Sequence, residues 1–165
     1  MASKELQNII KQKLDNPIDI NLPVELRRKQ LEDNAIKPPK EASIERVKVN
    51  SNSCYWVTMP NSKTDRLFFF IHGGGYTMGS AESSLSLASW IANETESKVF
   101  SINYRLAPEY PFPSAIEDTI EIYNWILSQN FSPEKMCVGG VSAGGGLALA
   151  LLIFLKENSI SIPAC

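Results

Sequence analysis

The segment from Cys137 to Leu155 constrains the fold of this chain more than any other part of it. Its 19 residues contain a single polar side chain, Ser142, and five glycines, at positions 139, 140 and 144–146. Its length approaches that of a bilayer-spanning helix, but glycines in this number favour a tight turn over one continuous helix. We therefore predict a buried strand over 136–139, a turn, and a helix over 147–155 that is apolar on every side, with no membrane span.

The rest of the chain also alternates between strand and helix patterns. Residues 67–71 read Leu-Phe-Phe-Phe-Ile, which is typical of a strand covered on both faces. The other predicted elements are a hairpin with strands near 46–49 and 54–59, a helix from Ser84 to about 93, a strand over 99–102 and a helix after Pro113. This alternation predicts an α/β fold: a mostly parallel sheet with helices on both faces.

Two helices are predicted ahead of this alternation. The first has apolar residues at helical spacing from Leu6 to Leu14 and ends at Asn16-Pro17. The second begins near Pro23 and ends before Pro38-Pro39. We expect residues 1–40 to form an amino-terminal helical cap and residues 41–165 to form the α/β core.

Composition excludes several classes of function. With 165 residues, a net charge of -2 and no basic stripe, the chain is one domain with no predicted nucleic-acid partner. Its three cysteines are too widely spaced for a disulfide framework or a zinc site. The first residues lack a signal-peptide core, and we expect a cytoplasmic location. No sequence feature bears on the oligomeric state.

The clearest chemical motif is Gly-Val-Ser-Ala-Gly at 140–144, which has the form G-x-S-x-G. It follows a predicted buried strand and precedes a helix, which is where a sharp turn can hold a serine exposed as a nucleophile. Small residues at Gly140 and Gly144 avoid clashes across such a turn. The alternative is a glycine-rich turn that only serves packing.

A second motif, His72-Gly73-Gly74-Gly75, also follows a predicted buried strand. Glycines allow close approach of the backbone, so that several N–H groups can point at one developing negative charge. A plain turn and a phosphate loop are the alternatives, although the Walker lysine and the G-x-G-x-x-G spacing are both missing. The coincidence of the two motifs is more specific than either of them.

Together with Tyr-Arg-Leu-Ala-Pro-Glu at 104–109, these motifs resemble the hormone-sensitive-lipase branch of the α/β-hydrolases from about Glu41 onward. Members of that branch are carboxylesterases and lipases with an amino-terminal helical cap. The resemblance implies that Ser142 is the nucleophile and that an oxyanion hole is formed by backbone amides of Gly74, Gly75 and Ala143, with Gly73 as a further candidate. His72 would support the motif, and Arg105 and Glu109 would fix a loop without taking part in catalysis.

The sequence departs from the family pattern in three respects. The usual aspartate before the serine is Val141, and the usual asparagine after the paired glycines is Gly146. In this fold the triad acid and histidine follow the serine. The 23 residues after Ser142 contain neither an aspartate nor a histidine. His72 is the sole histidine of the chain, so the triad is incomplete.

These observations predict a serine hydrolase that forms an acyl-enzyme with small-molecule carboxylic esters and that needs neither a metal nor an organic cofactor. The chain would correspond to the amino-terminal part of such an enzyme, truncated after the helix that follows Ser142, and would be nearly inactive by itself. Truncation would leave the strand before Ser142 as a sheet edge and expose one flank of the helix. The alternatives are a non-catalytic ligand-binding protein on a hydrolase scaffold, as in the gibberellin receptors, or a fragment without function.

Overall fold

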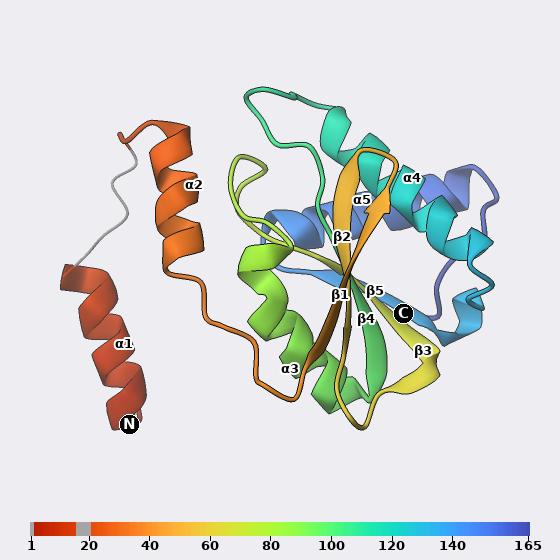
Figure 1. Ribbon diagram of the computed structural model, residues 1–165. Coiled ribbons are helices and arrows are strands. Elements are labelled where there is room, and N and C mark those ends of the chain that lie inside the picture. Colours follow the sequence, from red (N-terminus) through yellow and green to blue (C-terminus); the bar gives the residue numbers. More distant parts are fainter. Residues whose placement is uncertain (1, 16–20) are drawn as a thin grey trace.

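The computed structural model describes residues 2–15 and 21–165 (Figure 1). The predicted end of the first helix, at Asn16-Pro17, lies outside these residues. The elements in chain order are α1 (Lys4–Asp15), α2 (Val24–Asp33), β1 (Ser43–Val49), β2 (Asn52–Thr58), β3 (Lys63–Ile71), α3 (Leu85–Thr95), β4 (Ser97–Ile102), α4 (Ser114–Ser128), β5 (Met136–Gly140) and α5 (Ala143–Glu157). Short 3₁₀ turns at Glu82–Ser84 and Pro133–Lys135 precede α3 and β5.

The five strands form one sheet in the order β1-β2-β4-β3-β5. β4, β3 and β5 are parallel to one another, as the alternation of strands and helices predicts. β1 and β2 form the expected hairpin and join the sheet through antiparallel pairing of β2 with β4. The α/β class is therefore confirmed, and the sheet is mixed. Its parallel part contains β3 and β5, the two strands that lead into the glycine-rich motifs.

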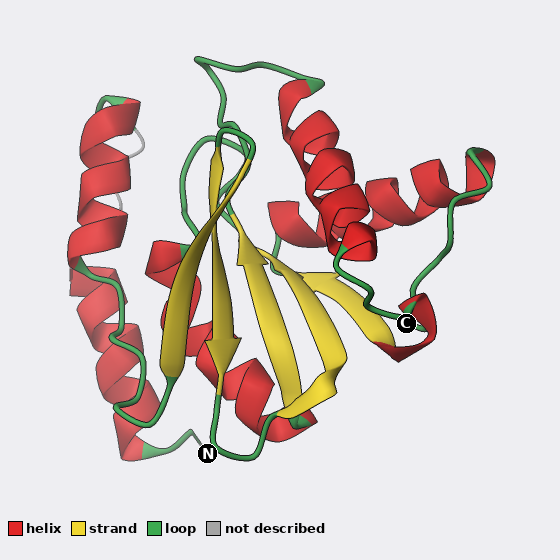
Figure 2. Ribbon diagram, turned by 45° about the vertical axis from the view of Figure 1, so that its right-hand side comes forward, coloured by secondary structure: helices red, strands yellow, loops and turns green. Residues whose placement is uncertain are grey.

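Helices cover both faces of the sheet, with α3 on one face and α4 and α5 on the other (Figures 1 and 2). Because neighbouring side chains of a strand point to opposite faces, the apolar run of β3 serves both layers. Phe69 and Ile71 join the core cluster that contains the buried residues of α4 and α5. Phe70 belongs to the cluster with Ala88 and Ala92 of α3. This double burial explains why β3 ends in five consecutive apolar residues.

Helix α5 begins at Ala143, four residues earlier than the predicted start at Leu147. The prediction placed the three glycines 144–146 in the turn, but they lie in the first turn of the helix. The physical reason is the close approach of the helix to the end of β3. A Cβ atom at Gly144 would lie 2.2 Å from the carbonyl oxygen of Ile71, so only glycine permits this contact.

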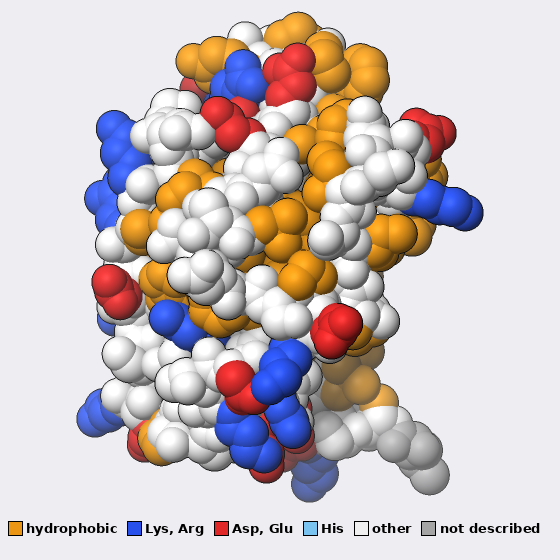
Figure 3. All heavy atoms as spheres, turned by 90° about the vertical axis from the view of Figure 1, so that its right-hand side faces the viewer, with side chains coloured by type: hydrophobic (Ala, Val, Ile, Leu, Met, Phe, Trp, Pro, Cys, Tyr) orange, Lys and Arg blue, Asp and Glu red, His pale blue; other side chains and the backbone are white. Residues whose placement is uncertain are grey.

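The outer flank of α5 exposes apolar side chains, as the sequence predicts. Leu149 is 65% exposed and Ile153 is 59% exposed. β5 is the last strand in the sheet order, although two backbone hydrogen bonds join it to Ala164 and Cys165. Figure 3 shows hydrophobic side chains gathered across the side of the molecule that it views. The helix is therefore apolar on its exposed flank as well as on its buried face, as predicted.

The two leading helices lie beside the sheet rather than within its layers (Figures 1 and 2). α2 begins directly after Pro23 and ends before Pro38-Pro39, as predicted. Side chains of α1 such as Leu6, Ile9 and Ile10 are about half exposed. Among the residues described here, no helix combines the length and the apolar character that crossing a membrane would require.

Candidate active site

The two glycine-rich motifs meet because their strands are neighbours in the sheet. β3 and β5 are parallel, and Ile71 at the end of β3 pairs with Gly140 at the end of β5. Because the carboxyl ends of parallel strands lie at the same edge, the loops that follow them emerge side by side. The amide of Val141 donates to the carbonyl of Ile71 at 3.2 Å and extends this pairing into the turn.

Ser142 lies at the tip of the turn between β5 and α5. Its side chain is exposed, and its backbone has φ 53° and ψ −117°, which non-glycine residues rarely adopt. Such a conformation costs on the order of 1–3 kcal/mol and is typical of functional sites. Its carbonyl accepts hydrogen bonds from Gly145 and Gly146, which ties the turn to the start of α5. Within the described chain its hydroxyl has no hydrogen-bond partner.

The loop after β3 lies directly against this turn. A Cβ atom built on Gly73 would lie 2.8 Å from the carbonyl oxygen of Val141 and 3.5 Å from the Cβ atom of Ser142. The next residues, Gly74 and Gly75, have φ angles of 128° and 62°, which L side chains rarely adopt. The structure therefore places the loop of Gly73, Gly74 and Gly75 against the turn of Ser142, with Gly73 at the contact.

Several backbone amides around Ser142 are available to a ligand. Those of Gly74, Gly75 and Ala143 donate to no acceptor within the described residues. Ala143 is also the first residue of α5, where the helix dipole favours negative charge. Unpaired donors at the end of a parallel sheet, beside an exposed hydroxyl, form a site suited to an oxyanion.

His72 lies beneath the loop and away from solvent. It is 1% exposed, and its ring stacks on Tyr104 with a centroid distance of 4.3 Å. Its Nδ1 atom donates to the carbonyl of Gly73 at 2.7 Å, since a carbonyl can only accept. Burial lowers the pKa of the imidazole, which keeps the ring neutral. These contacts fit support of the glycine loop better than proton transfer at Ser142.

The segment Tyr104–Glu109 is held in place by ion pairs at Arg105 and at Glu109. Nε of Arg105 donates to the Asp118 carboxylate of α4 at 2.8 Å, and the Arg105 amide donates to the same carboxylate at 2.7 Å. Glu109 pairs instead with Arg28 of α2 at 2.8 Å. Both residues fix the loop after β4, as expected, but each does so through a partner that the motif does not contain.

Sequence reasoning missed two residues next to the glycine loop. Arg28 binds the loop from α2, and a charged residue on an exposed helix carries no signal of this role. Tyr76 occupies the space opposite Gly146, where a Cβ atom would lie 2.7 Å from the tyrosine hydroxyl. Glycine at position 146, where the family usually has asparagine, could have indicated that a neighbouring side chain occupies this space.

Tyr76 and Gly146 border an apolar cavity of about 590 Å³ between α4 and α5. Phe112, Ile116 and Ile153 line its other walls. No group of three or more potential metal-ligating side chains occurs in the part of the chain that the structure describes. The arrangement thus combines an exposed hydroxyl, a set of free amides and a neighbouring apolar cavity.

Comparison with known proteins finds hydrolases in each case. A family model for the alpha/beta hydrolase fold matches residues 68–165. An acetyl-hydrolase from Streptomyces hygroscopicus is 36% identical over 118 residues, which cover 72% of this chain and 39% of the relative. Arylacetamide deacetylase from Oryctolagus cuniculus is 40% identical over 128 residues, which cover 66% of this chain and 32% of the relative.

Solved structures agree with these relatives. An esterase/lipase from an uncultured bacterium superposes with a TM-score of 0.93 at 33% identity and is covered over 56% of its length. An esterase from the bacterial hormone-sensitive lipase family superposes with a TM-score of 0.92 at 32% identity. This chain therefore spans about a third to two fifths of the curated relatives and just over half of the solved ones.

Proposed function

Because the chain belongs to the α/β-hydrolase fold family, in its hormone-sensitive-lipase branch, we propose that it provides the nucleophile and the oxyanion-binding amides of a carboxylic ester hydrolase. The observation that carries this proposal is the strained, exposed Ser142 beside the free amides of Gly74, Gly75 and Ala143. The names of the relatives, which include an acetyl-hydrolase and esterases, support the same reaction class.

The reaction proceeds by acyl transfer to the serine. The Ser142 hydroxyl oxygen attacks the ester carbonyl carbon, and the carbonyl oxygen becomes negatively charged. The three amides donate hydrogen bonds to this oxygen, and each such donor lowers the barrier by roughly 3 kcal/mol. The bond to the alcohol oxygen then breaks, the alcohol leaves with a proton, and water releases the acid from the acyl-enzyme.

Among its described residues, this chain offers no suitable general base to accept the proton of the Ser142 hydroxyl. The sole histidine, His72, is buried, and its Nδ1 atom is engaged by Gly73. No aspartate or histidine follows Ser142 in the 165 residues. We expect the chain by itself to show only residual activity, since binding and an oxyanion hole without the triad retain about 10³–10⁴-fold over water.

The remaining parts of the proposal concern substrate, domains and location. The apolar cavity beside Tyr76 supports a small-molecule ester with an uncharged group. Residues 1–40, which contain α1 and α2, form the cap, and residues 41–165 form the core that carries the site. The three free cysteines of the chain support a cytoplasmic location.

Labelling with a serine-directed phosphonate tests the assignment of the nucleophile. Such a reagent forms a covalent bond to the attacking oxygen and leaves a negatively charged phosphonyl oxygen that the amides can bind. Peptide mass spectrometry is expected to find the label on Ser142, and Ser142→Ala should abolish it. A label on another residue, with Ser142 unmodified, would show that the proposed nucleophile is wrong.

Ser159 offers a matched control in the same chain. It is an exposed serine with φ 54°, close to the φ of Ser142, and it lies in the turn after α5. Its own amide and those of Asn158 and Ile160 donate to carbonyls at the end of α5. We expect Ser159→Ala to leave the labelling rate unchanged, which would separate the effect of the amides from that of backbone strain and exposure.

A further inference from the structure

We propose that Arg28 of helix α2 is a positioning residue that holds the turn carrying the Gly74 and Gly75 amides, an inference that rests on the proposed function of those amides. Arg28 belongs to the leading helices and touches neither Ser142 nor its neighbours in the turn. Its effect on the reaction would therefore pass through the backbone of the glycine loop.

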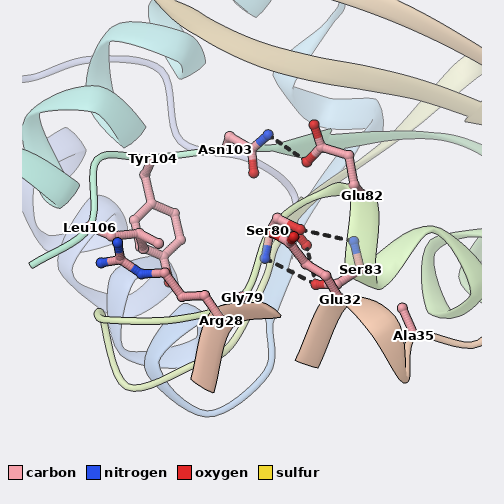
Figure 4. Close-up of a pocket in the computed structure, with 10 residues that line it drawn as sticks. All are labelled: Arg28, Glu32, Ala35, Gly79, Ser80, Glu82, Ser83, Asn103, Tyr104 and Leu106. Atoms are coloured by element: carbon pink, nitrogen blue, oxygen red, sulfur yellow. Dashed lines mark hydrogen bonds between the residues drawn. The ribbon is translucent and has the colours of Figure 1, made fainter. Parts of the chain in front are cut away.

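The guanidinium of Arg28 makes four hydrogen bonds to two loops. Nε donates to the carbonyl of Thr77 at 2.7 Å, and Nη2 donates to the carbonyl of Ala107 at 2.9 Å. Nη1 and Nη2 also donate to the two carboxylate oxygens of Glu109, each at 2.8 Å. Figure 4 shows the side chain extending from α2 past Tyr104 toward Leu106. A planar fork satisfies these acceptors together, whereas an ammonium group is a point charge.

Thr77 closes the turn that presents the free amides. The amides of Thr77 and Met78 both donate to the carbonyl of Gly74, at 3.2 and 2.9 Å. The three consecutive residues before Thr77, which are Gly74, Gly75 and Tyr76, all have positive φ. Glycine adopts such angles without strain, but Tyr76 does not, so the surrounding structure has to hold the run. The Thr77 carbonyl is one of the points at which it is held, and Arg28 supplies the donor.

The loop after β4 contacts the same turn at Tyr76, the residue before Thr77. The amide of Ala107 donates to the carbonyl of Tyr76 at 2.9 Å, and the Ala107 carbonyl accepts from Arg28. One guanidinium therefore joins adjacent points on both loops, Thr77 and Ala107, and Glu109 fixes its plane. Removing it leaves the Thr77 and Ala107 carbonyls without this shared donor and frees the turn to change its backbone angles.

Lys29 provides the matched control on the same helix. It is the next residue in sequence and carries the same charge, but its ion pair is with Asp33, one turn along α2. Exposed pairs of this kind contribute little to stability. A comparison of Arg28→Ala with Lys29→Ala thus separates the contacts to the loops from the loss of a positive charge on α2.

The first readout is the rate of phosphonate labelling at Ser142. A displacement of about 1 Å in a reacting group can cost 10²-fold in rate. We expect Arg28→Ala to lower the saturated labelling rate at least tenfold with little change in reagent affinity, and Lys29→Ala to leave both within twofold. Arg28→Lys is expected to recover thermal stability through Glu109 but not the labelling rate.

The second readout is hydrogen exchange of the amides of Thr77, Met78 and Ala107, which does not depend on labelling. We expect exchange at these amides to rise at least tenfold in Arg28→Ala and not in Lys29→Ala. If the unmodified chain is not labelled at Ser142, the proposed function fails, while the exchange data still decide whether Arg28 orders the turn. If Arg28→Ala and Arg28→Lys match Lys29→Ala in both rate and exchange, the positioning role is overturned.

Discussion

Two neighbouring glycines in the first turn of α5 allow the contact between α5 and β3 to be tested by substitution with alanine. A Cβ atom at Gly144 would lie 2.2 Å from the Ile71 carbonyl oxygen and 2.5 Å from that of His72. To reach the 3.0 Å that a real Cβ atom keeps, backbone of β3 or α5 has to shift. At Gly145 the nearest atom is the Gly140 carbonyl oxygen, at an acceptable 3.4 Å.

The expected magnitudes follow from two effects. Alanine in place of glycine stabilises a helix by up to about 1 kcal/mol, and both positions gain this to a similar extent. Forcing extra atoms into a closely packed site costs about 1–3 kcal/mol and more where backbone has to move. Gly144→Ala should therefore lower the free energy of unfolding by about 2 kcal/mol, and Gly145→Ala should leave it equal or higher by up to 1 kcal/mol.

Thermal unfolding followed by circular dichroism measures the difference. A difference of about 2–3 kcal/mol between the two variants corresponds to a difference in Tm on the order of 10 °C for a chain of this size. Because the shift separates the ends of β3 and β5, Gly144→Ala should also slow labelling of Ser142. Equal Tm values for the two variants would refute the claim that α5 starts in backbone contact with Ile71.

Three further predictions concern individual side chains. Ser142→Gly should be more stable than Ser142→Ala by about 1 kcal/mol in urea denaturation, because glycine relieves the positive φ; the usual opposite order would contradict the strain. Because burial lowers the pKa of the sole histidine from 6.5, the unfolded chain binds more protons, and the free energy of unfolding falls as pH falls from 7 to 5.5. The slope is at most about 1.4 kcal/mol per pH unit, and His72→Gln should flatten it. Arg28 lowers the pKa of Glu109 from 4.5 to about 2, so its stabilising effect is complete above pH 4.5 and is lost as pH falls toward 2; acid unfolding of Glu109→Gln should lack this contribution.

The apolar patterns of the chain predicted its layers because they are local. Strands β3 and β5 were expected as buried runs, and both occur with their carboxyl ends at the two motifs. The hairpin β1–β2 was also expected, but its antiparallel attachment to β4 was not. Which strand pairs with which depends on contacts between distant segments, and no periodicity encodes them.

The glycines around Ser142 also show which features the sequence predicts and which only the tertiary structure decides. Their number indicated a turn near Ser142, and the turn is present. Their placement differed from the prediction, because they lie in the first turn of α5, where Gly144 serves the close approach of the helix to β3. A sequence pattern reveals that a side chain is absent, but only the tertiary structure shows which neighbouring atoms require its absence.

The sequence by itself determined the elements, the two motifs and the lack of a histidine after Ser142, since these are properties of residues close together in the chain. The tertiary structure decided that Ile71 pairs with Gly140, so that the loop at Gly73 lies against the turn of Ser142, and that His72 is buried. It also joined Arg28 to partners 49 and 81 residues away. Contacts at such separations form only when the core brings the segments together, so local spacing cannot reveal them.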